Sequence, residues 1–262
     1  MEFTTTIWIA LGLTLLAGLA TTVGSFIGII YREPGPRYMA FTLGFSAGVM
    51  VFVSFMELLK QAVDSIGFLE ANVAFFVGVL VMFVIDLVMP HLYILEDQHG
   101  VGHTKDSKES KESKLKRTSV LVAIGIGIHN FPEGMATLAG TLKDIDVGIA
   151  MAIAIAIHNI PEGIAVAIPV YAATKSVGKA FKWSFISGLS EPVGALIAVL
   201  ILMPFLNDTV IGWLLAVVAG FMVFISFDEL LPVAHSYGRE HIAILGVTSG
   251  MLVMSVSLVL LI

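Results

Sequence analysis

Hydrophobic residues in this chain gather into long, nearly continuous runs separated mostly by short polar connections. A helix of about twenty apolar residues is long enough to cross a bilayer. By this criterion the sequence predicts eight transmembrane helices, at 5–31, 37–60, 70–95, 118–141, 147–172, 178–205, 210–236 and 241–262. The pattern therefore predicts an all-α integral membrane protein, with residues 1–262 forming a single transmembrane domain.

Composition agrees with a membrane setting. Hydrophobic residues make up 57% of the chain and charged residues 13%, whereas roughly a quarter of an ordinary soluble domain is charged. The chain has no cysteine, which excludes disulfides and thiolate metal sites. No Lys or Arg precedes the first apolar run, so that run lacks the basic start of a cleaved signal peptide and is expected to remain as a helix.

Lys and Arg are divided unequally between alternate connections. The connections after the first, third, fifth and seventh runs hold twelve of these residues, and the other connections hold two, Lys60 and Lys143. Because cytoplasmic loops are the basic ones, both termini are expected to lie outside the cell. The polar, repetitive segment 96–117 is then a flexible cytoplasmic loop. Its His99 and His103 could hold a metal transiently, but solvated side chains are the simpler explanation.

Two segments of the chain repeat each other. AGVMVFVSFMELL at 47–59 and AGFMVFISFDELL at 219–231 match at ten of thirteen positions and lie on predicted helices of opposite direction. Convergence of apolar low-complexity sequence could explain the shared Val, Phe and Leu, but it explains the shared SFxELL poorly. We therefore expect an inverted repeat that relates the first three helices to the last three and the fourth helix to the fifth. Such repeats are typical of secondary transporters.

A second pair of matching segments places polar residues in the middle of very apolar helices. HNFPEG spans 129–134 and HNIPEG spans 158–163, each starting twelve residues from a charged border, Arg117 or Asp146. Twelve residues are about 18 Å of helix, which reaches the middle of a bilayer. The His and Glu of each motif are four residues apart and share a helix face. The proline between them crowds the carbonyl four residues earlier, which predicts a kink that exposes backbone oxygen.

Carboxylates at this depth need compensation, because an ionised side chain at the bilayer centre costs at least about 2.5 kcal/mol. Glu191, in the mid-helix sequence SEP, adds a further carboxylate. Kinked helices whose His, Asn and Glu bond to one another are a structural alternative, but two copies at one depth favour a divalent cation. Imidazole, carboxylate and amide ligands suit zinc, iron(II), manganese or cobalt without choosing sharply among them.

The paired HNFPEG and HNIPEG motifs, with SEP at 190–192 and DELLP at 228–232, resemble the ZIP (Zrt/Irt-like) family of metal-ion transporters. The resemblance covers essentially the whole chain. It implies an eight-helix, 3+2+3 fold that imports zinc, and also iron, manganese, cobalt or cadmium, through the cell membrane into the cytoplasm. It also implies a binuclear metal site on the fourth, fifth and sixth helices. One metal would take Glu133, His158 and Glu162, with His129 as a further ligand. The adjacent metal would take Asn130, Glu133, Asn159, Glu162 and Glu191.

Polar residues near the cytoplasmic ends of the third and seventh helices form a candidate exit relay for the ion. They are Asp86, His91, Asp228 and Glu229, and the alternative is that they are ordinary interfacial residues.

An intramembrane metallohydrolase is the main rival function, because His and Glu four residues apart also occur in zinc proteases. Such enzymes need HExxH, which is absent here, and each glutamate is better placed as a ligand than as a base. We therefore expect a transporter rather than an enzyme, with no resident cofactor. The expected partners are divalent ions and lipid, without nucleic acid, and a homodimer is left open.

Overall fold

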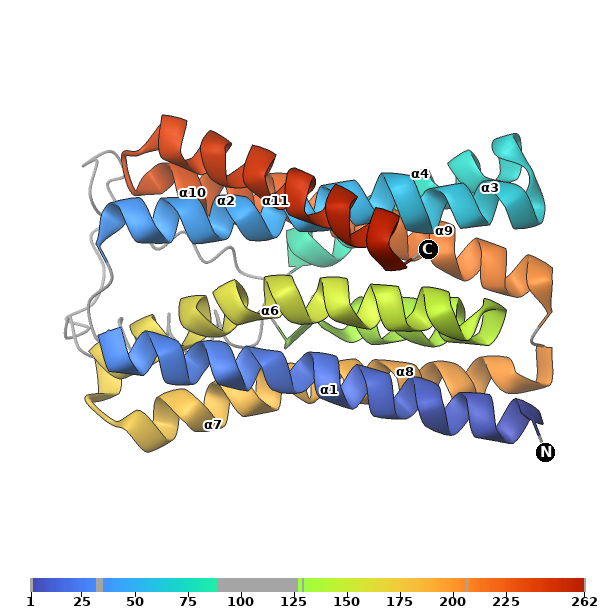
Figure 1. Ribbon diagram of the computed structural model, residues 1–262, viewed down its shortest axis with the longest axis horizontal. Coiled ribbons are helices and arrows are strands. Elements are labelled where there is room, and N and C mark those ends of the chain that lie inside the picture. The colour runs from blue at the N-terminus through green and yellow to red at the C-terminus, as the bar shows by residue number, and fades with distance from the viewer. Residues whose placement is uncertain (1, 32–34, 89–126, 129, 206, 262) are drawn as a thin grey trace.

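The computed structural model describes residues 2–31, 35–88, 127–128, 130–205 and 207–261. These residues are almost entirely helical, and none of them forms a strand (Figure 1). The helices are α1 (Glu2–Tyr31), α2 (Pro36–Val53), α3 (Lys60–Ile66), α4 (Phe68–Val88), α6 (Ile145–Thr174), α7 (Val177–Gly188), α8 (Ser190–Leu202), α9 (Asp208–Ile225), α10 (Leu231–Ser236) and α11 (Glu240–Leu261). The segment 130–143 is also helical. Three short elements complete the order: the π-helical η1 (Ser54–Leu59) and η4 (Ser226–Leu230), and the 3-10 turn η3 (Met203–Phe205).

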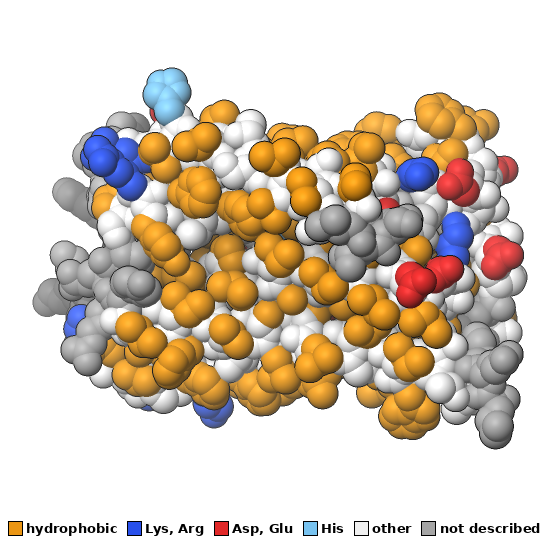
Figure 2. Space-filling view, in the orientation of Figure 1, with side chains coloured by type: hydrophobic (Ala, Val, Ile, Leu, Met, Phe, Trp, Pro, Cys, Tyr) orange, Lys and Arg blue, Asp and Glu red, His pale blue; other side chains and the backbone are white. Residues whose placement is uncertain are grey.

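The described part of the chain contains seven helical stretches that are long and apolar enough to cross a membrane. They correspond to seven of the predicted runs, while the predicted run 118–141 falls partly outside the described residues. Hydrophobic side chains cover the middle of the visible face, and the Lys, Arg, Asp and Glu side chains on it lie toward its two ends (Figure 2). The expectation of an all-helical protein with several membrane spans is therefore confirmed.

The helices pack as two bundles that run side by side along the molecule (Figure 1). The motif bundle carries both HNxPEG segments and consists of α1, the helix at 130–143, α6, α7 and α8. The flanking bundle consists of α2, η1, α3, α4, α9, η4, α10 and α11. Helix α6 packs against α2 and α11, so it lies at the interface between the two bundles.

Close helix contacts within each bundle are built on glycine. In the motif bundle a Cβ on Gly24 would collide with the carbonyl of Ile160, and in the flanking bundle a Cβ on Gly48 would collide with the carbonyl of Val247. Small residues allow transmembrane helices to approach each other closely. Wherever a described glycine is in tight contact with another helix, that helix belongs to the same bundle. Each bundle is therefore packed backbone against backbone within itself.

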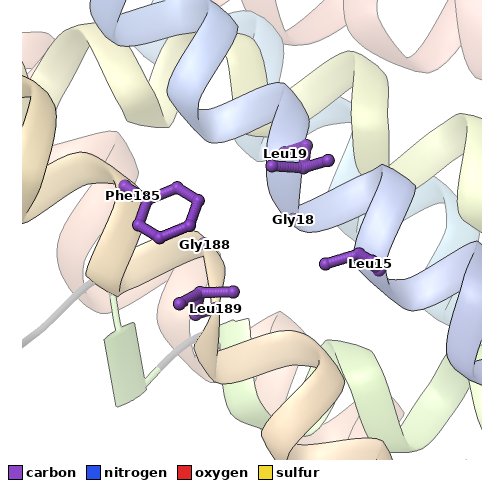
Figure 3. Close-up of a pocket in the computed structure, with 6 residues that line it drawn as sticks. All are labelled: Leu15, Gly18, Leu19, Phe185, Gly188 and Leu189. Carbon is purple, nitrogen blue, oxygen red and sulfur yellow. The ribbon is translucent and has the colours of Figure 1, made fainter.

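The crossing of α1 and α7 also rests on glycine. A Cβ on Gly18 or on Gly188 would collide with the carbonyl oxygen of the other. The side chains around this crossing line a small apolar groove (Figure 3); they are Leu15, Leu19, Phe185 and Leu189.

The predicted run 178–205 is not a single α-helix, because α7 ends at Gly188 and α8 begins at Ser190. Pro192 has no N–H with which to bond the Gly188 carbonyl, and this missing bond accounts for the break at Leu189.

The two π-helical segments occupy matching places in the two repeated sequences. In η1 the Ser54 hydroxyl donates to the Met50 carbonyl, and in η4 the Ser226 hydroxyl donates to the Met222 carbonyl, both at 2.7 Å. π-Helical turns inside α-helices are rare and frequent at functional sites. Through η1, helix α2 continues into α3 and reaches Ile66, beyond the predicted end at residue 60.

Candidate metal site

The two HNxPEG motifs face each other inside the motif bundle. Glu133 comes from the helix at 130–143, and His158 and Glu162 come from α6, where their four-residue spacing puts them on one face. The ligand atoms of these three side chains all lie within 4.8 Å of one another, and all three residues are fully buried. His158 Nε2 is 3.1 Å from Glu133 Oε1. Two carboxylates and an imidazole at this spacing can hold a divalent ion such as zinc.

Two asparagines beside this group present their amide oxygens. Asn159 Nδ2 donates to the Ala17 carbonyl at 3.0 Å and to Glu191 Oε1, and Asn130 Nδ2 donates to the Ser187 carbonyl at 3.2 Å. A backbone carbonyl can only accept, so these bonds identify which amide atom is nitrogen. Neither Oδ1 atom has a hydrogen-bond partner among the described residues. Both amide oxygens are therefore available as ligands.

The site concentrates negative charge in apolar surroundings. Glu133, Glu162 and Glu191 are all fully buried. Oε2 of Glu133 and Oε2 of Glu191 have no hydrogen-bond partner within the described ranges. Neighbouring carboxylates disfavour each other's ionised form, and burial of unpaired charge adds a desolvation cost. A divalent cation bound among them would offset both costs.

Most of the predicted ligands are thus brought to one region, on three helices and fully buried. These are Asn130, Glu133, His158, Asn159, Glu162 and Glu191. The predicted ligand His129, the relay residue His91 and the loop 96–117 lie outside the described residues.

The family model for ZIP zinc transporters matches residues 94–258, a stretch that includes both HNxPEG motifs. The chain belongs to the ZIP family. Curated relatives match it over nearly their whole length. The zinc transporter ZupT of Corynebacterium efficiens is 51% identical, over 97% of this chain and 97% of the relative. The zinc transporter ZupT of Streptococcus mutans is 48% identical, over 95% of this chain and 96% of the relative. The zinc transporter ZupT of Nitratidesulfovibrio vulgaris is also 48% identical, over 96% of each chain.

These findings confirm the resemblance inferred from the motifs. Together with the seven apolar helices of the described residues, they identify a multi-pass bacterial membrane protein of the ZIP family.

One side chain of this ZIP protein reaches the site from the flanking bundle and was not singled out from the sequence. Ser46 on α2 is fully buried, and its Oγ lies 3.4 Å from the His158 carbonyl oxygen and 3.5 Å from Glu162 Oε1. Both distances are long for hydrogen bonds from a hydroxyl, so Ser46 is near the ligands without being held firmly by them. The signal in the sequence is a serine inside an apolar run, which by itself indicates no more than helix packing.

The acidic residues of the predicted exit relay lie on neighbouring segments. Asp86 on α4 and Asp228 and Glu229 on η4 are half-buried. Helix α4 packs against α9, which leads into η4, and the rings of Phe83 and Phe224 are 6.2 Å apart at this contact. An acidic passage on this side of the flanking bundle remains a prediction.

Proposed function

We propose that this ZIP protein carries zinc into the cytoplasm through a mid-membrane site formed by Glu133, His158 and Glu162. The observation that carries the proposal is the buried group of two carboxylates and one imidazole, with ligand atoms within 4.8 Å of one another. Imidazole nitrogen and carboxylate oxygen are ordinary ligands of zinc. The relatives are named as zinc transporters, and the absence of HExxH from the sequence favours transport over hydrolysis.

A second ion position is proposed beside the first, with Asn130, Asn159 and Glu191 as its own ligands and Glu133 and Glu162 shared. The available Oδ1 atoms of the two asparagines and Oε2 of Glu191 support this position. Because these ligands are all oxygen atoms, the position suits harder ions such as manganese and iron(II) better than an imidazole site does. We propose that the protein accepts these ions in addition to zinc.

We also propose that the helices form an inverted 3+2+3 repeat, and the glycine contacts of the motif bundle support it. Gly24 meets the Ile160 carbonyl, and Gly194 meets the Phe131 carbonyl. Phe131 and Ile160 occupy the same position in the two HNxPEG motifs. Gly24 and Gly194 are separated by nearly the same interval as the two repeated sequences AGVMVFVSFMELL and AGFMVFISFDELL. This correspondence supports a repeat that relates one contact to the other.

The flanking bundle provides a second matched pair of contacts. Gly78 meets the Val217 carbonyl, and Gly250 meets the Phe45 carbonyl. The interval from Gly78 to Gly250 equals the interval from Phe45 to Val217, and both equal the interval between the two repeated sequences. Repeats of this kind let one bundle move against another around a central site and open it to either side in turn.

Zinc uptake by a Glu133→Gln variant tests the proposal. Glutamine keeps the size of the side chain but removes the charge that two ions would share, so we expect uptake to fall at least about tenfold. Glu240→Gln, which changes an exposed glutamate at the start of α11, is the control and should transport like the parent. Uptake by Glu133→Gln within about twofold of the parent, at equal amounts in the membrane, would refute the shared-ligand role.

A further inference from the structure

A lysine joins the two bundles at one end of the molecule. Lys143 ends the helix at 130–143, and its Nζ lies 3.0 Å from the Gln61 carbonyl oxygen and 2.8 Å from Ser65 Oγ, both on α3. The Ser65 hydroxyl donates in turn to the same Gln61 carbonyl, at 2.9 Å. The ammonium group therefore completes a closed set of three hydrogen bonds. Hydrogen bonds from an ionised donor are stronger than those between neutral groups, although Lys143 is exposed and water weakens them here.

Both sides of this contact are anchored within their own bundles. Helix α3 packs on α9 so closely that a Cβ on Gly212 would collide with Ser65 and Ile66. On the other side, the Asp144 side chain accepts from the Asp146 N–H at 2.8 Å and caps the start of α6. Neither side can follow the other freely. A displacement of one bundle along the other would break the Lys143 hydrogen bonds.

The contact is short compared with the Ser46 contacts that connect the bundles near the metal site. Those are 3.4 and 3.5 Å, against 3.0 and 2.8 Å for Lys143. Apolar residues also pack across the described part of this interface: Ala136 and Ala139 of the motif bundle belong to the same core cluster as residues of α2, α4 and α9. Lys143 thus adds a directional contact at the edge of this apolar packing.

The sequence provides no counterpart of this contact at the other end of the proposed repeat. When the two HNxPEG helices are aligned on their motifs, Lys143 corresponds to Ala172. When the two repeated sequences of the flanking bundle are aligned, the Gln61 carbonyl corresponds to that of Val233 and Ser65 corresponds to Tyr237, so the missing group is the lysine. Alanine has no side-chain donor that could bridge the bundles. If the two halves were related by an exact twofold axis, the state open to the outside and the state open to the cytoplasm would have similar energies. A contact present at one end alone makes the energies of these two states unequal.

We propose that Lys143 is a latch that holds the outer ends of the two bundles together and so favours the state closed to the outside. This proposal rests on the import function and the orientation proposed above. For an ion to enter from outside, the two bundles must move relative to each other at this end, which breaks the hydrogen bonds of Lys143 to Gln61 and Ser65. The latch acts on the balance between the closed and open states and touches no metal ligand.

The accessibility of a buried reporter thiol tests the latch without metal. Ala139 lies one turn before Lys143 on the same helix, is 1% exposed and belongs to the cluster shared with the flanking bundle. Because the chain has no cysteine, an Ala139→Cys variant offers one thiol to a membrane-impermeant maleimide. With Lys143→Met added, we expect labelling from outside to become about threefold to tenfold faster. Lys143→Arg keeps a charged donor and should label nearly at the rate of Ala139→Cys alone.

Lys60→Met is the matched control. It removes an exposed lysine from the first turn of α3, and the structure gives Lys60 no side-chain hydrogen bond among the described residues. Its labelling rate should match that of Ala139→Cys alone. Equal labelling with and without Lys143→Met, an equal rise from Lys60→Met, or labelling from the cytoplasmic side alone would each overturn the latch. If Ala139→Cys fails to fold, Ala136→Cys, one turn deeper and also buried, replaces it. Since no metal is used, failure of the zinc proposal would leave these outcomes unchanged.

Discussion

Two kinds of candidate ligand atom meet in the proposed metal site, and they suit different ions. His158 offers an imidazole nitrogen next to Glu133 Oε1, at 3.1 Å, whereas Asn159 is bonded to Glu191 and to the Ala17 carbonyl. Imidazole suits zinc well, while carboxylate and amide oxygens suit harder ions. The Asn159–Glu191 bond and the His158–Glu133 contact are compatible with the two proposed ion positions.

Loss of His158 should weaken zinc transport more than manganese or iron transport. We expect His158→Ala to lower the ratio of zinc to manganese uptake about tenfold. Asn159→Ala should instead change the preference among ions and leave measurable zinc uptake. The measurement is uptake of zinc, iron and manganese by both variants in parallel. If both variants lose all three ions in equal proportion, the two positions work as one unit and the division is wrong.

A thiol at the position of Ser46 should alter ion preference, because the hydroxyl it replaces is 3.5 Å from Glu162 Oε1. Sulfur favours softer ions, so Ser46→Cys should raise cadmium uptake relative to manganese by about tenfold. Bound zinc should also slow alkylation of the introduced thiol. Ser54→Cys is the control, since Ser54 is equally buried but its hydroxyl bonds to the Met50 carbonyl. If the ratio of cadmium to manganese uptake is unchanged and zinc does not slow alkylation, Ser46 does not lie beside the bound ion.

The sequence was sufficient to predict which motif residues meet, but not the contacts of Ser46 and Lys143. Four-residue spacing puts His158 and Glu162 on one face of a helix, and the resemblance to the ZIP family placed Glu133 with them. Ser46 reaches the site because one particular face of α2 turns toward α6. Lys143 reaches Ser65 because α2 continues through η1 into α3. Both contacts depend on the relative placement of helices far apart in the sequence, which periodicity alone does not determine.

At the scale of helices, the glycine of each HNxPEG motif sets the distance to a neighbouring helix. A Cβ on Gly163 would collide with the Thr21 carbonyl on α1, and a Cβ on Gly134 would collide with the Glu191 carbonyl on α8. The motif therefore supplies both the proposed ligands and a close helix contact within a few residues. The break between α7 and α8 lies near the contact of Gly134 with Glu191. The apolar run at 178–205 predicted one continuous helix, because hydropathy does not detect the N–H that proline lacks.

A methyl group at Gly163 should push α1 away from α6 and pull the Ala17 carbonyl from Asn159. We expect Gly163→Ala to destabilise the protein by roughly 1–3 kcal/mol and to reduce zinc uptake. Gly178→Ala is the matched control, because no atom lies within 4 Å of the added Cβ and alanine is the better helix former. Thermal unfolding of the purified variants in detergent provides the measurement. If Gly163→Ala and Gly178→Ala had equal melting temperatures, α1 would be able to move away from α6 without loss of stability, and the prediction would be wrong.

At the scale of the whole molecule, charge is divided between the two ends. Lys175, Lys179 and Arg239 are exposed at one end of the bundles, and Asp144 and Asp208 are exposed at the other, where Lys143 lies. The visible face between the two ends is covered mainly by hydrophobic side chains (Figure 2). Because basic residues favour the cytoplasmic side, the end with Asp144 is proposed to face outward. This orientation decides whether the Lys143 contact closes the entrance or the exit of the ion path.

Single thiols at the two ends test the orientation directly. Asp144 and Ser236 are both exposed, one before α6 and the other at the end of α10, and the chain contains no other thiol. In intact cells an impermeant maleimide should label Asp144→Cys. It should label Ser236→Cys only after the cells are permeabilised, since basic loops stay in the cytoplasm. The reverse pattern would turn the protein over in the membrane. The Lys143 contact would then lie on the cytoplasmic side, where breaking it would let an ion leave the site instead of enter it.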